Sequence, residues 1–136
     1  MITAVDTSVL LDIFGADPTF GARSKTVLRS CISTGSLVAC EVVWAEVAGF
    51  FPSPEAAQDA MSRLGVEFSA IELETALAAS SFWKKYRGKG GRRDRVVADF
   101  LIGAHASLQA NRLLTRDRGF YRAYFSSLKV IDSSKA

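Results

Sequence analysis

Four acidic residues occupy positions where a carboxylate is unusual. Asp6 and Asp117 each follow a short apolar run, in AVD and LLTRD, so each is expected just after a buried strand. Glu46 and Asp99 lie within otherwise apolar segments, VVWAEVAGFF and VVADFLIGAHA. A carboxylate among apolar neighbours is costly to bury unless it is paired or bound to a metal ion. These residues are therefore the candidates for carrying chemistry.

The helical neighbours of Glu46 and Asp99 offer little compensating charge. The residues three and four positions from Glu46 are apolar, and Arg95 is the one basic candidate near Asp99. A divalent cation would compensate all of these acids together, because close carboxylates repel by about 4 kcal/mol per pair at an effective dielectric of about 20. Hard carboxylate oxygens without His or Cys favour Mg²⁺ or Mn²⁺ over zinc. Such a metal can polarise a phosphodiester and activate water, so no protein nucleophile is required.

Several polar residues near these acids have two interpretations. Ser8 and Thr115 are candidate catalytic residues that would position metal-bound water, and helix capping is an equal alternative for each. Asp6 itself, in Asp-Thr-Ser before an apolar run, also has the pattern of a helix N-cap. Asp12 follows Ser8 by four positions and is expected at most at the rim of the site.

Five other residues of reactive types are expected to be structural. His105 lies six positions after Asp99, which is about 240° around a helix, so it points away from the proposed site. Glu41 and Asp94 are interpreted as helix-start residues. The two cysteines, Cys31 and Cys40, are too few for a disulfide framework and lack C-x-x-C spacing, so both are expected in the core.

Basic residues are concentrated in the C-terminal half. The net charge is +3, and residues 84–95, KKYRGKGGRRDR, contain seven basic residues against one acid. Such clustering attracts a polyanion, although a solvated surface loop is the alternative. The residues expected to bind RNA are Lys89, Arg92, Arg93 and Arg116. Trp83 and Tyr86 could stack on unpaired bases, with core packing expected for at least one of them.

Short apolar runs alternate with helical patterns along the chain, which predicts an α/β fold. Strands are expected at Ile2–Val5, 37–40, Val66–Phe68, 113–115 and 129–131. Helices are expected at 8–14, from Pro18 after an Asp17 cap to about 34, and at 41–51, Pro54–Leu64, 72–86, 94–110 and 120–125. Parallel strands need helical crossovers, so we expect one domain over 1–136, a three-layer α/β/α arrangement around a parallel sheet. Ligands of such sheets bind beyond the carboxyl ends of the strands.

Composition and local pattern exclude several classes of protein. With 136 residues, 49% hydrophobic and 23% charged, the chain fits one globular domain and not a disordered protein. It has no apolar run of about 18 residues and no basic leader, so a cytoplasmic protein without a membrane partner is expected. Ser8 stands two positions after Asp6, where a phosphoaspartyl phosphatase would have a second Asp. A phosphoacceptor signalling domain would need an adjacent acidic pair there and a lysine after the last strand.

With these residues in place, the chain resembles PIN-domain nucleases, and closely the toxins of bacterial and archaeal VapBC toxin–antitoxin pairs. The matching segments are VDTSVLLDIF, WAEVAGFF and ADFLIGAHASLQANRLLTRDRGFYRAYF, which span nearly the whole chain in order. The resemblance implies metal-binding acids at Asp6, Glu46, Asp99 and Asp117, with Ser8 and Thr115 as polar accessories. It also implies cleavage of structured RNA such as tRNA, a homodimer, and inhibition by an antitoxin whose tail fills the active-site groove. The glycine-rich basic loop at 87–93 departs from the family pattern.

Two alternatives stay open within this resemblance. A housekeeping RNA-processing PIN nuclease would carry the same residues as a toxin, and the sequence hardly separates the two. A non-catalytic RNA-binding module with a PIN-like fold would not need the four acids, so their presence favours the enzyme.

Overall fold

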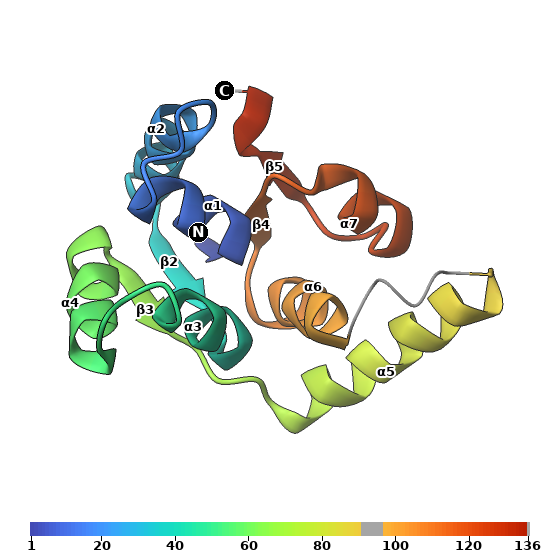
Figure 1. Cartoon of the computed structure of the whole chain (residues 1–136). Coiled ribbons are helices and arrows are strands. Elements are labelled where there is room, and N and C mark those ends of the chain that lie inside the picture. Colours follow the sequence, from blue (N-terminus) through green and yellow to red (C-terminus); the bar gives the residue numbers. More distant parts are fainter. Residues whose placement is uncertain (91–96, 136) are drawn as a thin grey trace.

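Five strands form one parallel sheet at the centre of the molecule (Figure 1), in a computed structural model that describes residues 1–90 and 97–135. The strands are β1 (Ile2–Val5), β2 (Ser36–Ala39), β3 (Val66–Phe68), β4 (Arg112–Thr115) and β5 (Val130–Asp132). Their order across the sheet is β3-β2-β1-β4-β5, and every pairing is parallel. The predicted fold class is therefore confirmed.

Helices connect the strands as crossovers. They are α1 (Thr7–Phe14), α2 (Gly21–Ile32), α3 (Glu41–Ala48), α4 (Pro54–Leu64), α5 (Leu73–Gly88), α6 (Val97–Gln109) and α7 (Arg118–Tyr124), followed by a 3-10 turn, η1 (Ser133–Lys135). The chain first winds from β1 towards β3 and later from β4 towards β5, and right-handed crossovers then place α1–α4 on one face and α5–α7 on the other. In Figure 1, α1 and α2 accordingly lie on one side of β4, and α6 and α7 on the other. The winding reverses between β1 and β4.

Several predicted helix boundaries were wrong, including that of the helix expected at 120–125, which is Arg118–Tyr124. The second helix begins at Gly21 and not at Pro18, because the Oδ1 of Asp17 accepts hydrogen bonds from the backbone N–H groups of Thr19 at 2.9 Å and Phe20 at 2.8 Å. These bonds form a turn that precedes the helix. The third helix, α3, ends at Ala48, and α5 continues to Gly88. The predicted cap at Asp94 lies outside the described residues.

The core joins the sheet to both helical layers. Aromatic side chains fill the space between α5, α6 and α7, where Phe100, Phe120 and Phe125 pack against one another. Gly103 allows this packing, because a Cβ there would overlap the ring of Phe125. Tyr86 also belongs to this cluster and is 5% exposed, so it is a core residue and not a platform for an unpaired base.

The predictions of structural roles for His105 and the cysteines are confirmed. His105 is fully buried, and its Nε2 lies 2.9 Å from the Oγ of Ser69. Burial is the main cause that lowers the pKa of this imidazole. Cys31 and Cys40 are buried free thiols. In the part of the chain that the structure describes, no helix has the length and apolar character needed to cross a membrane.

Candidate active site

Asp6 is placed by the end of a buried strand and the start of a helix. The backbone N–H of Asp6 donates to the carbonyl of Leu114 at 2.9 Å, which extends the pairing of β1 with β4 by one residue. Asp6 then becomes the N-cap of α1, with its Oδ1 accepting from the N–H of Thr7 at 2.8 Å. Asp6 can therefore be both a helix cap and a site residue, because Oδ1 caps the helix and Oδ2 faces Thr115 at the end of β4.

Thr115 connects Asp6 to the loop that carries Asp117. Its hydroxyl donates to the Oδ2 of Asp6 at 2.7 Å and accepts from the backbone N–H of Asp117 at 2.9 Å. Thr115 is completely buried, so this hydroxyl bridge is shielded from solvent. Asp117 holds the N-cap position of α7, although its side chain is not used for a capping hydrogen bond among the described residues. Ser8 lies farther away, with its Oγ 3.5 Å from the Oδ2 of Asp6.

Glu46 reaches the same edge of the sheet from α3. Its Oε1 accepts a hydrogen bond from the hydroxyl of Thr7 at 2.7 Å, and Thr7 is the residue that follows Asp6. Glu46 is exposed, so the argument that an acid at this position must be buried was wrong. Thr7 was not among the predicted site residues, because its position in Asp-Thr-Ser suggested only a helix start. Its hydroxyl orients Glu46 towards the first turn of α1.

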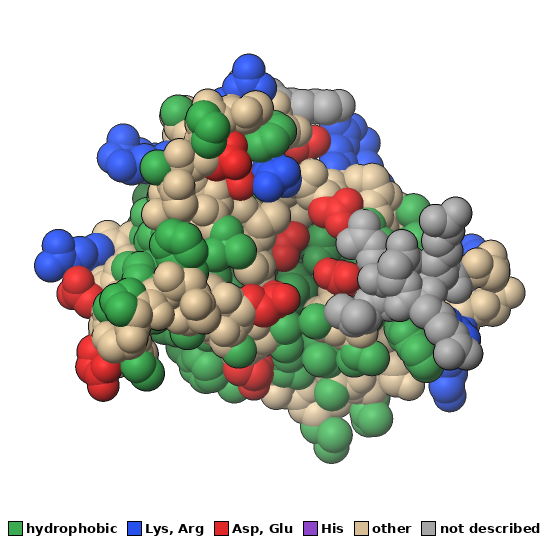
Figure 2. Space-filling view, in the orientation of Figure 1, with side chains coloured by type: hydrophobic (Ala, Val, Ile, Leu, Met, Phe, Trp, Pro, Cys, Tyr) green, Lys and Arg blue, Asp and Glu red, His purple; other side chains and the backbone are tan. Residues whose placement is uncertain are grey.

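Asp99 approaches from the opposite face of the sheet. It lies in the first turn of α6, which packs against β1 and α3. Because α6 ends where β4 begins, its first turn lies at the carboxyl edge of the sheet. Figure 2 shows acidic side chains gathered in the middle of this face, between α1 and α3 on one side and α6 and α7 on the other.

The electrostatic environment of Asp6 reflects this convergence. The pKa of Asp6 is raised from its usual 3.8 to about 6, mainly by burial and to a smaller extent by the negative charges of Asp99 and Asp117. The hydrogen bonds from Thr115 and Thr7 act in the opposite direction. Asp6 is 7% exposed. Its charged form is therefore disfavoured at the point where two further carboxylates contribute negative charge.

The donor set suits a hard cation but is not arranged around one. Among residues 1–90 and 97–135, no three acidic, histidine or cysteine side chains are close enough to form a ready-made metal site. The chemistry nevertheless fits Mg²⁺ or Mn²⁺, because the donors are carboxylate oxygens and a cation would relieve the unfavourable charge on Asp6.

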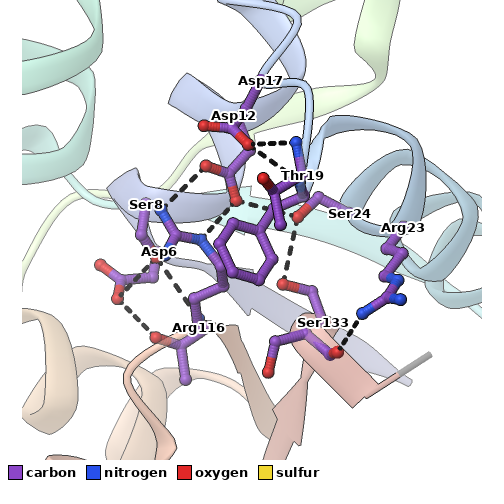
Figure 3. A network of polar contacts seen from close by, with 12 residues as sticks. Asp6, Ser8, Asp12, Asp17, Thr19, Arg23, Ser24, Arg116 and Ser133 are labelled. Carbon is purple, nitrogen blue, oxygen red and sulfur yellow. Dashed lines mark hydrogen bonds and ion pairs between the residues drawn. The ribbon is translucent and has the colours of Figure 1, made fainter.

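A second polar network adjoins Asp6, centred on Asp12 and Arg116 (Figure 3). The Nε of Arg116 lies 2.6 Å from the Oδ2 of Asp12, and its Nη2 lies 2.9 Å from Oδ1. Asp12 was expected at the rim of the site, and it faces Arg116. The prediction that Arg116 binds RNA stays a prediction, with the guanidinium already held by Asp12. The cost of burying an acid in SVLLDIF is the signal in the sequence that could have identified Asp12.

Of the other residues predicted to bind RNA, the structure describes one. Lys89 is exposed at the C-terminal end of α5. Arg92 and Arg93 lie outside the described residues. Trp83 is partly buried, with the guanidinium of Arg87 5.7 Å from the centre of its ring. Arg87 and Lys89 thus place positive charge at the end of α5.

Comparison with known proteins extends over nearly the whole chain. Residues 3–126 match the family model described as PIN domain. A search among curated protein sequences found no match. Three similar solved structures are two VapBC proteins and one toxin-antitoxin complex, and at these identities they establish a common fold alone.

The first of the three is VapBC2 from Rickettsia felis bound to a DNA fragment from its promoter, with 17% identity, 97% of this chain and 98% of that chain covered, and a TM-score of 0.77. VapBC-1 from nontypeable Haemophilus influenzae has 19% identity and a TM-score of 0.74, and the match covers 98% of this chain and 99% of that chain. A toxin-antitoxin complex from Klebsiella pneumoniae has 19% identity and a TM-score of 0.70, and the match covers 96% of this chain and 97% of that chain.

Proposed function

Since this chain belongs to the PIN-domain family, we propose that it is an endoribonuclease dependent on Mg²⁺ or Mn²⁺ and the toxin of a VapBC-type toxin–antitoxin pair. The observation that supports the metal-dependent activity is the buried carboxyl of Asp6, with Asp99 and Asp117 close enough to raise its pKa. The similar structures of toxin–antitoxin assemblies support the role as a toxin.

The residues that would hold the metal are Asp6, Asp99, Asp117 and Glu46. When bound, the cation would polarise the phosphodiester and lower the pKa of a water molecule that attacks phosphorus. Thr115 orients the Oδ2 of Asp6, and Thr7 orients Glu46. Because these two hydroxyls are already donated to carboxylates, we assign them to positioning the acids and not to binding water directly. Ser8, whose contacts within residues 1–90 and 97–135 are long, is the hydroxyl better placed to adjust when a ligand enters.

The proposed substrate is cellular RNA such as tRNA, which places the activity in the cytoplasm. Arg87 and Lys89 at the end of α5 would contact the phosphate backbone through charge. The proposed partners are a cognate antitoxin, which would block the acidic edge, and a second copy of the chain. Sedimentation of the purified protein tests the homodimer.

Cleavage of RNA by the purified protein tests the enzymatic proposal. We expect end-labelled tRNA to be cut with Mg²⁺ or Mn²⁺ and not with excess EDTA, and we expect Asp6→Ala and Asp117→Ala to lose cleavage while retaining the helical circular-dichroism signal. Asp59→Asn is the matched control, because Asp59 is an exposed acid paired with Arg63 on α4. Equal cleavage in EDTA would contradict the proposal, and the absence of cleavage under all conditions would favour a non-catalytic module.

Growth of a bacterium that expresses the chain tests the role as a toxin. The chain alone should arrest growth, and co-expression with the adjacent antitoxin gene should restore it. Normal growth with the active chain alone would favour the housekeeping RNA-processing nuclease.

A further inference from the structure

We infer that Arg116 and Asp12 form a positioning pair that fixes the loop bearing Thr115 and Asp117 against the helix capped by Asp6. This inference rests on the proposed function, since it concerns the same metal-binding acids. It assigns Arg116 to the internal geometry of the site.

The contact between Arg116 and Asp12 is bidentate, and it joins a buried carboxylate to a guanidinium side chain that is 32% exposed. Both Asp12 oxygens accept from the guanidinium, at 2.6 and 2.9 Å, and Asp12 is 4% exposed. A planar guanidinium matches a carboxylate in this way, and an ammonium group cannot. The contact therefore defines an orientation as well as a distance.

Neighbouring groups hold the two side chains in this orientation. The guanidinium carbon of Arg116 lies 4.4 Å from the centre of the Phe20 ring, so the ring packs against one face of the charged group. On the other side, the hydroxyl of Ser24 donates to the Oδ2 of Asp12 at 3.1 Å and lies 3.1 Å from the Oγ of Ser133 in η1. Figure 3 shows these groups converging on Asp12 from α2 and from the C-terminal turn. The carboxylate is thus bonded by side chains from two segments, Ser24 on α2 and Arg116 after β4, and Ser133 contacts Ser24.

The pair joins the two elements that carry the central carboxylates. Asp12 lies on α1, whose N-cap is Asp6, and Arg116 lies between Thr115 and Asp117. The backbone N–H of Arg116 also contacts the Oγ of Ser8 at 3.4 Å. If the pair were lost, the hydroxyl bridge of Thr115 and the longer contact between Arg116 and Ser8 would still connect this loop to the start of α1. A metal that binds acids from both elements depends on their separation, and outer contacts of this kind commonly change metal affinity by about 10- to 100-fold.

Mn²⁺ binding measured by calorimetry without RNA tests the inference. The variant Arg116→Lys keeps the charge but loses the bidentate contact, and Arg116→Met removes the charge as well. We expect about tenfold weaker Mn²⁺ binding for Arg116→Lys and a larger loss for Arg116→Met, with both variants folded by circular dichroism. If Arg116→Met fails to fold, the lysine variant alone decides the question.

The exposed pair of Asp59 and Arg63 on α4, 2.9 Å apart, provides the matched control. Arg63→Lys should leave Mn²⁺ affinity unchanged. If Arg116→Lys lowers the free energy of unfolding in EDTA but leaves the Mn²⁺ affinity unchanged, the pair is merely structural and the inference is overturned. Unchanged Mn²⁺ affinity with a raised KM for RNA would also overturn it, and would assign Arg116 to the substrate. If the wild-type chain binds no Mn²⁺, the proposed function itself fails, and the inference fails with it.

Discussion

Replacing Asp6 with asparagine should make the metal-free protein more stable above pH 7, even though it removes a central residue of the site. In the folded protein the pKa of Asp6 is raised from 3.8 to about 6. A raised carboxyl pKa means that the folded state binds the proton more tightly than the unfolded state. The associated stability is present below about pH 4 and is lost as the pH rises through about 6.

The size of the effect follows from the pKa and the hydrogen bonds. The pKa of Asp6 differs by about 2 units between the unfolded protein, at 3.8, and the folded protein, at about 6. At 1.36 kcal/mol per unit, the ionised carboxylate destabilises the folded protein by about 3 kcal/mol at neutral pH. Asparagine avoids this cost and keeps an oxygen for the N–H of Thr7. It replaces the acceptor of the Thr115 hydroxyl with a donor, which costs about 1 kcal/mol. The expected net gain is about 2 kcal/mol above pH 7, and a loss of about 1 kcal/mol remains near pH 4.

Urea unfolding in EDTA at several pH values between about 4 and 8 measures this difference. Asp59→Asn is the control, and the free energy of unfolding of that variant should stay within about 0.5 kcal/mol of wild type throughout, because its side chain is exposed. Added Mg²⁺ should reverse the order and stabilise the wild type alone. A constant difference between Asp6→Asn and wild type across the pH range would refute the assignment of a buried, repelled carboxylate.

Three further predictions concern the same region. Because Asp6 must lose its proton to bind a cation, the affinity for Mg²⁺ in calorimetry should fall about tenfold per pH unit below about 6, and equal affinities at about pH 5 and pH 7 would argue against Asp6 as a ligand. Thr115→Val removes the hydroxyl bridge between Asp6 and the loop, so we expect the free energy of unfolding in urea to fall by about 1–3 kcal/mol. An unchanged urea midpoint would show that the bridge is dispensable. Gly103→Ala should lower the free energy of unfolding by about 1–3 kcal/mol through overlap with Phe125, whereas Gly88→Ala, a helical control with open space at this position, should not lower it. Equal thermal midpoints for the two glycine variants would contradict the packing argument.

The sheet and its acidic edge could be predicted because their signals are local. A short apolar run that ends in Asp is visible without knowledge of its neighbours, and the parallel arrangement then brings Asp6 and Asp117 to the same edge. Helix ends were less predictable. Asp17 has the pattern of an N-cap, yet its side chain bonds Thr19 and Phe20 in a turn before the helix.

Contacts between distant positions were beyond the sequence. Arg116 and Asp12 are 104 positions apart, and nothing in the spacing of either residue indicates the other. Arg116 therefore resembled the other basic residues of its region. Burial also depended on the fold, since the apolar neighbours of Glu46 suggested an enclosed acid and the structure exposes it.

The most direct test of the metal-binding claim is anomalous diffraction from crystals of the wild-type protein grown with Mn²⁺. The account predicts a manganese peak coordinated by the carboxylate of Asp6 together with Asp99 or Asp117. A peak held by other residues, or a map without manganese at this edge of the sheet in crystals that contain the ion, would contradict it.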